Sequence, residues 1–256
     1  MTGATGDFET AAREVAATVG RCVASSVGGE RRVGVAFSGG LDSSVVVACA
    51  SRHARVLACS AYVRGAVDCA RARKAAAALG ADLLETELNL EDARQALANL
   101  ALPFAPSLMD RSLWCLYSAV ARRAHEAGLK VVLLGQLADE LFGGYAKYEE
   151  GLERMGERGV RDMMRADFDG YASRGRVRDV GAFSGWVEPR LPFDSRELAE
   201  LAASIPTSFL IRGGARKAVL RRAAVILGVP EEIAGTPKKA AQYSSGVQKL
   251  VASLHF

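Results

Sequence analysis

The sequence predicts an α/β fold in which a parallel sheet is flanked by helices. An apolar, strand-like run at 33–37 stops at a Ser-Gly-Gly turn, and a second apolar run of helical character follows it directly. Further strand-like runs occur at 55–63, 82–88 and 130–134, with helix-length segments between them. Parallel strands joined by such crossovers end at one edge of the sheet, where α/β proteins bind their ligands.

The helices are predicted from their periodicity and from the glycines at their ends. Residues Phe8–Val27 have an apolar face and a polar face, and they form a leading helix in a segment 1–30 that precedes the main domain 31–256. An Ala- and Arg-rich helix is expected at 66–80, and a longer helix is expected at 106–127. These helices are expected to lie on the faces of the sheet.

The segment 145–185 is rich in Arg, Glu, Asp and Met, and its periodic stretches predict helices that cover the site. Gly170, Gly175 and Gly181 are expected to break these helices. Substrate specificity is expected to reside in this cover segment.

Composition and charge argue against several classes of protein. Half of the residues are hydrophobic, yet no apolar run approaches the roughly 18 to 20 residues of a membrane span. The N-terminus has no basic-then-apolar signal pattern, so a cytoplasmic protein is expected. The net charge of +4 suits a polyphosphate ligand and leaves RNA open as a partner. The five cysteines form no C-x-x-C pair, which argues against a zinc or iron–sulfur site.

The strand–turn–helix junction at 33–47 carries the main functional signal. The first N–H groups of a helix lack partners within the helix and the dipole is positive there, so the junction suits a phosphate. Gly39 and Gly40 let the backbone approach an anion, and nearby serine hydroxyls add donors. Asp42 would repel a phosphate unless a divalent cation lay between them, which predicts a Mg²⁺ ligand. An ordinary helix-start turn is the alternative for so short a motif.

A second polar junction follows the strand at 130–134 and leaves the sheet at the same edge. Asp139 and Glu140 fall in the first turn of a predicted helix, where a favourable interaction with the helix dipole is one explanation. That explanation does not account for carboxylates that project toward the predicted phosphate site. Asp139 is therefore predicted to bind Mg²⁺ together with Asp42.

Both junctions resemble one protein family. The run SGGLDS at 38–43 is similar to the PP-loop of the ATP pyrophosphatases, which have an adenine nucleotide alpha hydrolase-like fold. The run GQLADELFGGY at 135–145 is similar to a motif in the synthetase domain of asparagine synthetases and β-lactam synthetases. EPRLPFD at 188–194 and the K-x-x-L-R pattern within 211–221 are similar to two further motifs of that family.

The resemblance implies a reaction and a set of residues. ATP and Mg²⁺ would be used to adenylate a small, aspartate-like carboxylate, and ammonia or another amine would then displace AMP. Lys238, with Lys239 as the fallback, is implied to neutralise the pyrophosphate, although a solvated loop would explain these lysines without the resemblance. The implied catalytic residues are Lys238, Lys239, Asp139 and Gln136, and the metal ligands are Asp42 and Asp139. The implied nucleotide-binding residues are Phe37, Ser38, Gly39, Gly40, Leu41, Asp42, Ser43, Ser44 and Gly135.

Two departures from the family pattern bear on the amine. Gln136 stands where the family usually has a glutamate, and glutamine cannot act as a base, so the acceptor is expected to differ or the base to come from elsewhere. The chain begins Met1-Thr2-Gly3 rather than with a glutaminase nucleophile, so free ammonia, another amine or a separate glutaminase subunit is expected as the donor. The alternatives are a PP-loop enzyme that modifies RNA and a nucleotide-binding protein without turnover.

Overall fold

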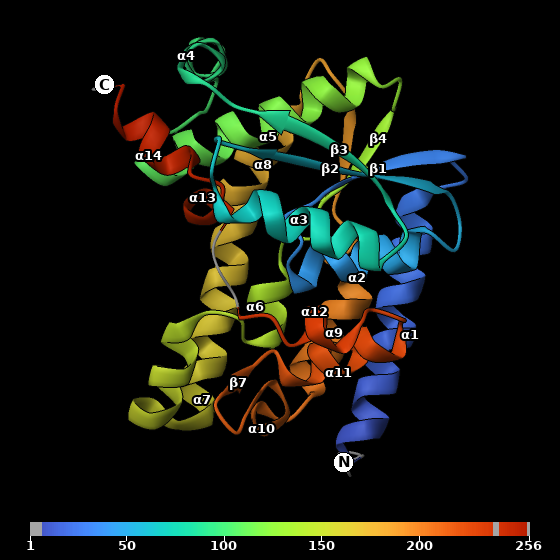
Figure 1. The fold of residues 1–256 in the computed structure, drawn as a ribbon. Helices are drawn as coiled ribbons and strands as arrows, with labels where there is room; N and C mark the ends of the chain where they lie inside the picture. The colour runs from blue at the N-terminus through green and yellow to red at the C-terminus, as the bar shows by residue number, and fades with distance from the viewer. Residues whose placement is uncertain (1–6, 238–240, 255–256) are drawn as a thin grey trace.

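The computed structural model describes residues 7–237 and 241–254, and its centre is a parallel sheet of five strands in the order β3-β2-β1-β4-β5 (Figure 1). A small antiparallel hairpin, β6 with β7, lies apart from this sheet. The strands are β1 (Arg32–Ala36), β2 (Arg55–Tyr62), β3 (Asp82–Glu87), β4 (Val131–Leu133), β5 (Glu188–Arg190), β6 (Ile211–Arg212) and β7 (Ala215–Arg216). The predicted α/β class, a parallel sheet flanked by helices, is confirmed.

Helices cover both faces of the sheet, with α5 over one face and α2 and α3 over the other (Figure 1). The first helices are α1 (Phe8–Val27), α2 (Leu41–Ala50), α3 (Val67–Ala78), α4 (Leu90–Ala98), α5 (Leu108–Glu126), α6 (Ala138–Phe142) and α7 (Ala146–Gly170). They are followed by a π-helical turn (Tyr171–Gly175), α8 (Arg176–Phe183), α9 (Arg196–Ser204), α10 (Thr207–Leu210), α11 (Ala218–Ile226), α12 (Glu231–Ala234), α13 (Ala241–Ser244) and α14 (Val247–Ala252). Within the described ranges, none of these helices is both long and apolar enough to traverse a lipid bilayer.

Alternation along the strands divides the interior into two hydrophobic cores. Val33 and Val35 of β1 face the core beneath α1, α2 and α3, and so do Val131 and Leu133 of β4. Val132, between the last two, faces the core beneath α5. Side chains of a strand alternate between the two faces of a sheet, so a run of Val and Leu supplies both cores at once.

The order of the strands places the two predicted junctions next to each other. β1 pairs with β2 on one side and with β4 on the other, and Val35 of β1 lies opposite Leu133 of β4. The loops that leave β1 and β4 therefore start side by side at the carboxyl edge of the sheet. An open α/β sheet binds ligands at such a point, where the crossovers from neighbouring strands lead to opposite faces.

Several elements were not predicted as such, and β5 and α4 are two of them. Residues 188–190, expected only as part of a motif, form the edge strand β5, and Pro189 is tolerated there because an edge strand leaves one side of its backbone unpaired. The helix α4 begins with a capping box in which Asn89 and Asp92 bond each other's backbone N–H groups.

The prediction that glycines break the helices of the cover segment is wrong at three positions. Gly170 and Gly175 have helical φ angles near −61°, the backbone passes through both as α7 continues into a π-helical turn and α8, and Gly181 lies inside α8. The interruption falls instead at Gly156, where φ is 67°. A glycine in a helix costs only about 1 kcal/mol, so neighbouring contacts decide whether the helix continues.

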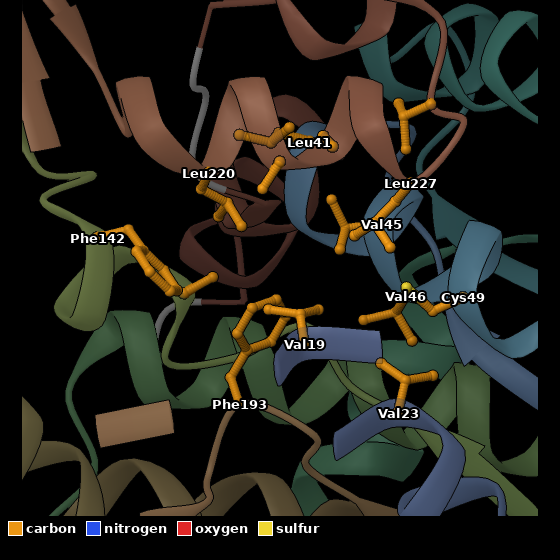
Figure 2. Packing of buried hydrophobic residues seen from close by; sticks show 14 of the residues in the cluster. Val19, Val23, Leu41, Val45, Val46, Cys49, Phe142, Phe193, Leu220 and Leu227 are labelled. Atoms are coloured by element: carbon orange, nitrogen blue, oxygen red, sulfur yellow. The ribbon is translucent and has the colours of Figure 1, made fainter. Parts of the chain in front are cut away.

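The core below the site joins elements that are distant in the sequence. Figure 2 shows Leu41 and Val45 of α2 and Leu220 of α11 pointing toward one another, with Phe142 of α6 and Phe193 nearby. The rings of Phe142 and Phe193 meet edge to face, with their centroids 6.4 Å apart. Because α2, α6 and α11 pack into this one core, their first turns are fixed relative to each other.

Replacing Phe193, which is fully buried, tests this packing. Phe193→Ala should lower the free energy of unfolding by about 3–5 kcal/mol, because the cavity it leaves removes contacts to α6. The measurement is the urea midpoint followed by circular dichroism. Met155→Ala is the control, since its side chain is 53% exposed. A Phe193→Ala midpoint equal to that of the wild type would contradict this account of the core.

Candidate active site

The first loop, at 38–40, joins β1 to α2 and is shaped by one glycine. Gly39 has φ 70°, and a Cβ at this position would lie 2.7 Å from the carbonyl oxygen of Arg71. Only glycine suits both the conformation and the close approach. The Ser43 hydroxyl donates to the carbonyl oxygen of Gly40 (3.2 Å) and thereby joins the loop to the first turn of α2. The first N–H groups of a helix have no partner within the helix, as an anion site requires.

The second loop, between β4 and α6, lies directly against the first. A Cβ on Gly135 would be 3.2 Å from the backbone nitrogen of Ser43, so glycine permits this close contact. Leu137 then adopts a left-handed conformation with φ 75° and leads into α6, which carries Asp139. A non-glycine residue at positive φ is strained, and such strain is often retained at functional sites.

Asp42 and Asp139 are brought together by Lys217. The Nζ atom of Lys217 lies 2.6 Å from one carboxylate oxygen of Asp42 and 2.8 Å from one of Asp139. The Lys217 side chain is only 2% exposed, and the two carboxylates are 15% and 11% exposed. Two carboxylates from separate crossovers therefore reach one cation at the edge of the sheet.

Gly144, just after α6, makes room for this cluster. A side chain at this position would collide with the carboxylate of Asp139 and with Cε of Lys217. The Gly143-Gly144 pair is therefore more than a helix stop, because the second glycine allows the lysine to reach both acids.

The sequence reasoning missed Lys217. The available signal was the K-x-x-L-R pattern, in which Lys217 is the first residue, but nothing in the sequence links it to Asp42, which lies 175 residues away. Lys217 also has a positive φ, 56°, as the residue that precedes α11. In the described residues, Leu137 and Lys217 are the two non-glycine residues at positive φ, and both lead into elements of this cluster.

The two acids fit the predicted metal. Mg²⁺ is usually bound by one or two carboxylates together with substrate phosphates, rather than by a full set of protein ligands. Over the part of the chain that the structure describes, no group of three or more His, Cys, Asp or Glu side chains could hold a metal by itself. In place of their contact with Lys217, Asp42 and Asp139 could therefore hold Mg²⁺ together with a phosphate ligand.

Two small cavities, of about 100 Å³ and about 40 Å³, share Ser38 and Asp42. Predicted residues on the first cavity are Phe37, Ser38, Asp42, Ser43, Gly135 and Gln136, together with Tyr117 and Asp68, which were not predicted. The second is lined by Ser38, Gly40, Leu41 and Asp42, with Arg71, Lys217 and Arg221. Of the predicted residues that the structure describes, Gly39, Ser44 and Asp139 line neither cavity, and Ser44 is fully buried. A cavity of about 720 Å³ between α4, α5 and α8 contains none of the predicted residues, so we place the site by its chemistry and not by volume.

Gln136 belongs to a buried polar network that reaches the cover segment. Its amide nitrogen donates to Asp179 (2.7 Å), which is fully buried and is also bonded by Arg178 (2.7 Å) and Tyr171 (2.9 Å). Arg178 continues to Asp110 on α5. A glutamate at position 136 would place a second carboxylate against Asp179, so the family residue does not suit this environment.

The remaining positions named from the sequence are Glu140, Lys238 and Lys239. Burial raises the pKa of Glu140, and the hydroxyl of Tyr145 donates to its carboxylate (2.6 Å), which opposes that shift. Lys238 and Lys239 lie outside the described residues. Their described neighbours Pro237 and Ala241 line the second and the first cavity, respectively.

The chain was then compared with known proteins. The profile of the asparagine synthase family matches residues 14–186 and 156–255. The chain belongs to the asparagine synthase family. It is 30% identical to a Methanocaldococcus jannaschii protein named "Putative asparagine synthetase (glutamine-hydrolyzing) 1", over 90% of this chain and 48% of that protein.

Two other members of the asparagine synthase family illustrate the range of relatives. Asparagine synthetase domain-containing protein 1 of Mus musculus is 30% identical over 56% of this chain and 24% of its own length. The glutamine-hydrolysing asparagine synthetase of Asparagus officinalis is 28% identical over 74% of this chain and 35% of its own length. The chain thus spans about half or less of the length of these relatives.

Substitution of Gly144 tests the geometry of the acidic pair. Gly144→Ala should weaken Mg²⁺-ATP binding at least about tenfold, because a displaced Asp139 loses its place beside Asp42, and the overpacking should cost about 1–3 kcal/mol of stability. Isothermal titration calorimetry and thermal unfolding provide the two measurements. Gly170→Ala is the control, because Gly170 has a helical conformation and open space around its Cβ position. Equal ATP affinity in Gly144→Ala and the wild type would contradict the assignment.

Proposed function

We propose that the protein is an ATP-dependent, AMP-forming amide ligase. It adenylates a small, aspartate-like carboxylate and transfers the acyl group to ammonia or an amine, with release of pyrophosphate. The observation that carries this proposal is the convergence of Asp42 and Asp139 on one cation beside the 38–43 loop. Membership in the asparagine synthase family supports the class of reaction.

In this proposal the chain itself supplies most of the phosphate contacts. The N–H groups at the start of α2 and the hydroxyls of Ser38 and Ser43 hold the phosphates of ATP. Mg²⁺ held by Asp42 and Asp139 would neutralise negative charge on these phosphates. Lys217 lines the second cavity, so its ammonium group would add positive charge beside the phosphates. Lys238, with Lys239 as the alternative, is proposed to stabilise the departing pyrophosphate.

Adenylation and acyl transfer are both nucleophilic displacement reactions. An oxygen of the substrate carboxylate bonds to the α-phosphorus while the bond to the β-phosphate oxygen breaks, and the electron pair leaves with pyrophosphate. The amine nitrogen then bonds to the acyl carbon while the bond to AMP breaks, and the nitrogen loses one proton to solvent. Gln136 cannot take that proton, but its side chain lines the first cavity and is oriented by Asp179.

The amine source and the compartment are part of the same proposal. Free ammonia, another small amine or ammonia from a separate glutaminase subunit would serve as the donor. We place the reaction in the cytoplasm, where ATP and amino acids are available.

The RNA-modifying alternative is less well supported by the cysteines. Cys59 lies on the wall of the first cavity, and burial raises the pKa of its thiol to about 12. Sulfur transfer needs a thiolate near neutral pH, and a thiol with this pKa stays protonated. Nothing in the first cavity therefore favours sulfur chemistry.

ATP–pyrophosphate exchange tests the proposal. We expect exchange that depends on an added amino acid, with L-aspartate tested first and the other amino acids next. Lys217→Met should lower the exchange rate by about 100-fold or more, since a buried charge that stabilises the transition state is lost. Lys74→Met is the control, because Lys74 pairs with Glu232 at 2.8 Å, is 69% exposed and lines neither cavity.

Other outcomes of this experiment would contradict the proposal. Exchange only in the presence of tRNA would indicate the RNA-modifying enzyme. Nucleotide binding with no exchange for any amino acid would indicate a protein that binds ATP without turnover.

A further inference from the structure

We propose that Arg71 binds the pyrophosphate portion of ATP and that Asp68 is the residue that positions it. This inference rests on the proposed function and adds two residues of α3 that no sequence motif indicated. It concerns the second cavity, which is bounded by the 38–43 loop, by Arg71 and by the region around Lys217 and Arg221.

The position of Arg71 beside the loop is fixed by its backbone and its side chain. Its Nε atom donates to the carbonyl oxygen of Ser38 (2.9 Å), and its Nη2 atom donates to the carboxylate of Asp68. The backbone of the same turn of α3 touches Gly39, where a Cβ would lie 2.9 Å from Cα of Ala72. The Arg71 side chain is 14% exposed, and Arg71 lines the second cavity.

Three N–H groups of Arg71 remain available for an anion. A guanidinium has five N–H groups, and the bonds to Ser38 and Asp68 use Nε and Nη2. Among the residues that the structure describes, Nη1 has no hydrogen-bond partner. Arg71 can therefore keep both of its contacts and still donate to a phosphate oxygen.

Arg221 is held differently. Its Nε atom donates to the carbonyl oxygen of Arg216 (2.7 Å), and Nη1 donates to the carbonyl oxygens of Ala234 and Thr236. Arg221 thus fastens the chain around Thr236 and contributes charge, whereas Arg71 is tied to the loop itself. The second cavity is lined by three cationic side chains and one carboxylate, that of Asp42, which suits a polyanion.

The carboxylate of Asp68 orients the Arg71 side chain. The Asp68 side chain is 3% exposed, and Asp68 lines the first cavity whereas Arg71 lines the second. The other oxygen of Asp68 accepts a hydrogen bond from the hydroxyl of Ser244 in α13 (2.8 Å). Next to it, the N–H of Val63 donates to the carbonyl oxygen of Ser245 (2.8 Å). Asp68 is therefore braced by the C-terminal helices while it orients Arg71.

The role in the reaction follows from this geometry. As the bond between the α-phosphorus and the bridging oxygen breaks, negative charge grows on the leaving pyrophosphate. Arg71 donates hydrogen bonds to that charge and transfers no proton, because its guanidinium stays protonated. Arginine suits this task since its planar fork matches phosphate oxygens.

Binding of Mg²⁺-pyrophosphate, measured by isothermal titration calorimetry, tests the inference without any turnover. Arg71→Gln should weaken this binding by about 10- to 100-fold, because a charge-assisted hydrogen bond is lost. The pyrophosphate affinity of Arg71→Lys should lie between those of the wild type and Arg71→Gln, since lysine keeps the charge but lacks the planar fork of arginine. AMP lacks the β- and γ-phosphates, so the affinity of each Arg71 variant for AMP should stay within about threefold of that of the wild type.

Arg73→Gln is the matched control. Arg73 lies on the same helix two residues later, pairs with Glu85 at 2.9 Å, is 60% exposed and does not line the second cavity. Its loss removes the same charge from α3, so it reports any effect of net charge alone. Arg73→Gln should leave pyrophosphate affinity within about threefold of the wild type.

Asp68→Asn separates positioning from simple electrostatics. Removal of a negative charge near the site should tighten pyrophosphate binding if charge alone matters. If Asp68 positions Arg71, the same variant should bind pyrophosphate about 3- to 10-fold more weakly. Circular dichroism of each variant shows whether it has folded.

The binding results distinguish a failure of the proposed function from a failure of the roles of Arg71 and Asp68. A wild-type protein that binds neither Mg²⁺-pyrophosphate nor Mg²⁺-ATP would overturn the proposed function. Suppose that the wild type binds pyrophosphate. If Arg71→Gln binds it with the same affinity, or if Arg71→Gln and Arg73→Gln lose affinity equally, the role of Arg71 would be overturned and the proposed function would stay in place. Tighter binding by Asp68→Asn would overturn the positioning role of Asp68.

Discussion

The buried contact of Lys217 with Asp42 and Asp139 is the interaction on which the site depends. Burying an ammonium group costs several kcal/mol unless carboxylates compensate for the lost water, and here two of them do so. Each of the three residues stands at the start of a different helix, so the contact fixes α2, α6 and α11 relative to each other. The same contact holds the two acids side by side at the edge of the sheet.

The rest of the fold supports this contact from below and from the sides. Phe142, Leu220 and Leu41 come from the three helices that this contact joins, and they pack into one core (Figure 2). Gly135 and Gly144 let the two loops and the lysine approach more closely than side chains would permit. The strain of Leu137 and Lys217, both at positive φ, is maintained by this surrounding structure. The site is thus specified by packing at some positions and by backbone shape at others.

Much of the architecture could be predicted from local patterns. The strands have apolar runs, the helix α1 has the predicted bounds, and both glycine-containing junctions lie at one edge because a parallel sheet with crossovers requires it. The adjacency of β1 and β4 was not predicted. The contacts that complete the site could not be predicted in this way. Lys217 meets Asp42 across 175 residues, and Asp179 meets Gln136 across 43, through a fold that no local pattern encodes. The helix break at Gly156 was also unpredictable, since glycines that differ little in sequence context behave differently according to their tertiary contacts.

The most direct test of the central claim is a double-mutant cycle on Mg²⁺-ATP affinity with Asp42→Asn, Asp139→Asn and the double variant. If both carboxylates act on one cation, either single substitution should already remove most of the Mg²⁺-ATP binding free energy. The loss in the double variant should then be smaller than the sum of the two single losses by about 1 kcal/mol or more. Losses that add to within about 0.5 kcal/mol would show that the two acids act independently, and that result would contradict a shared cation site.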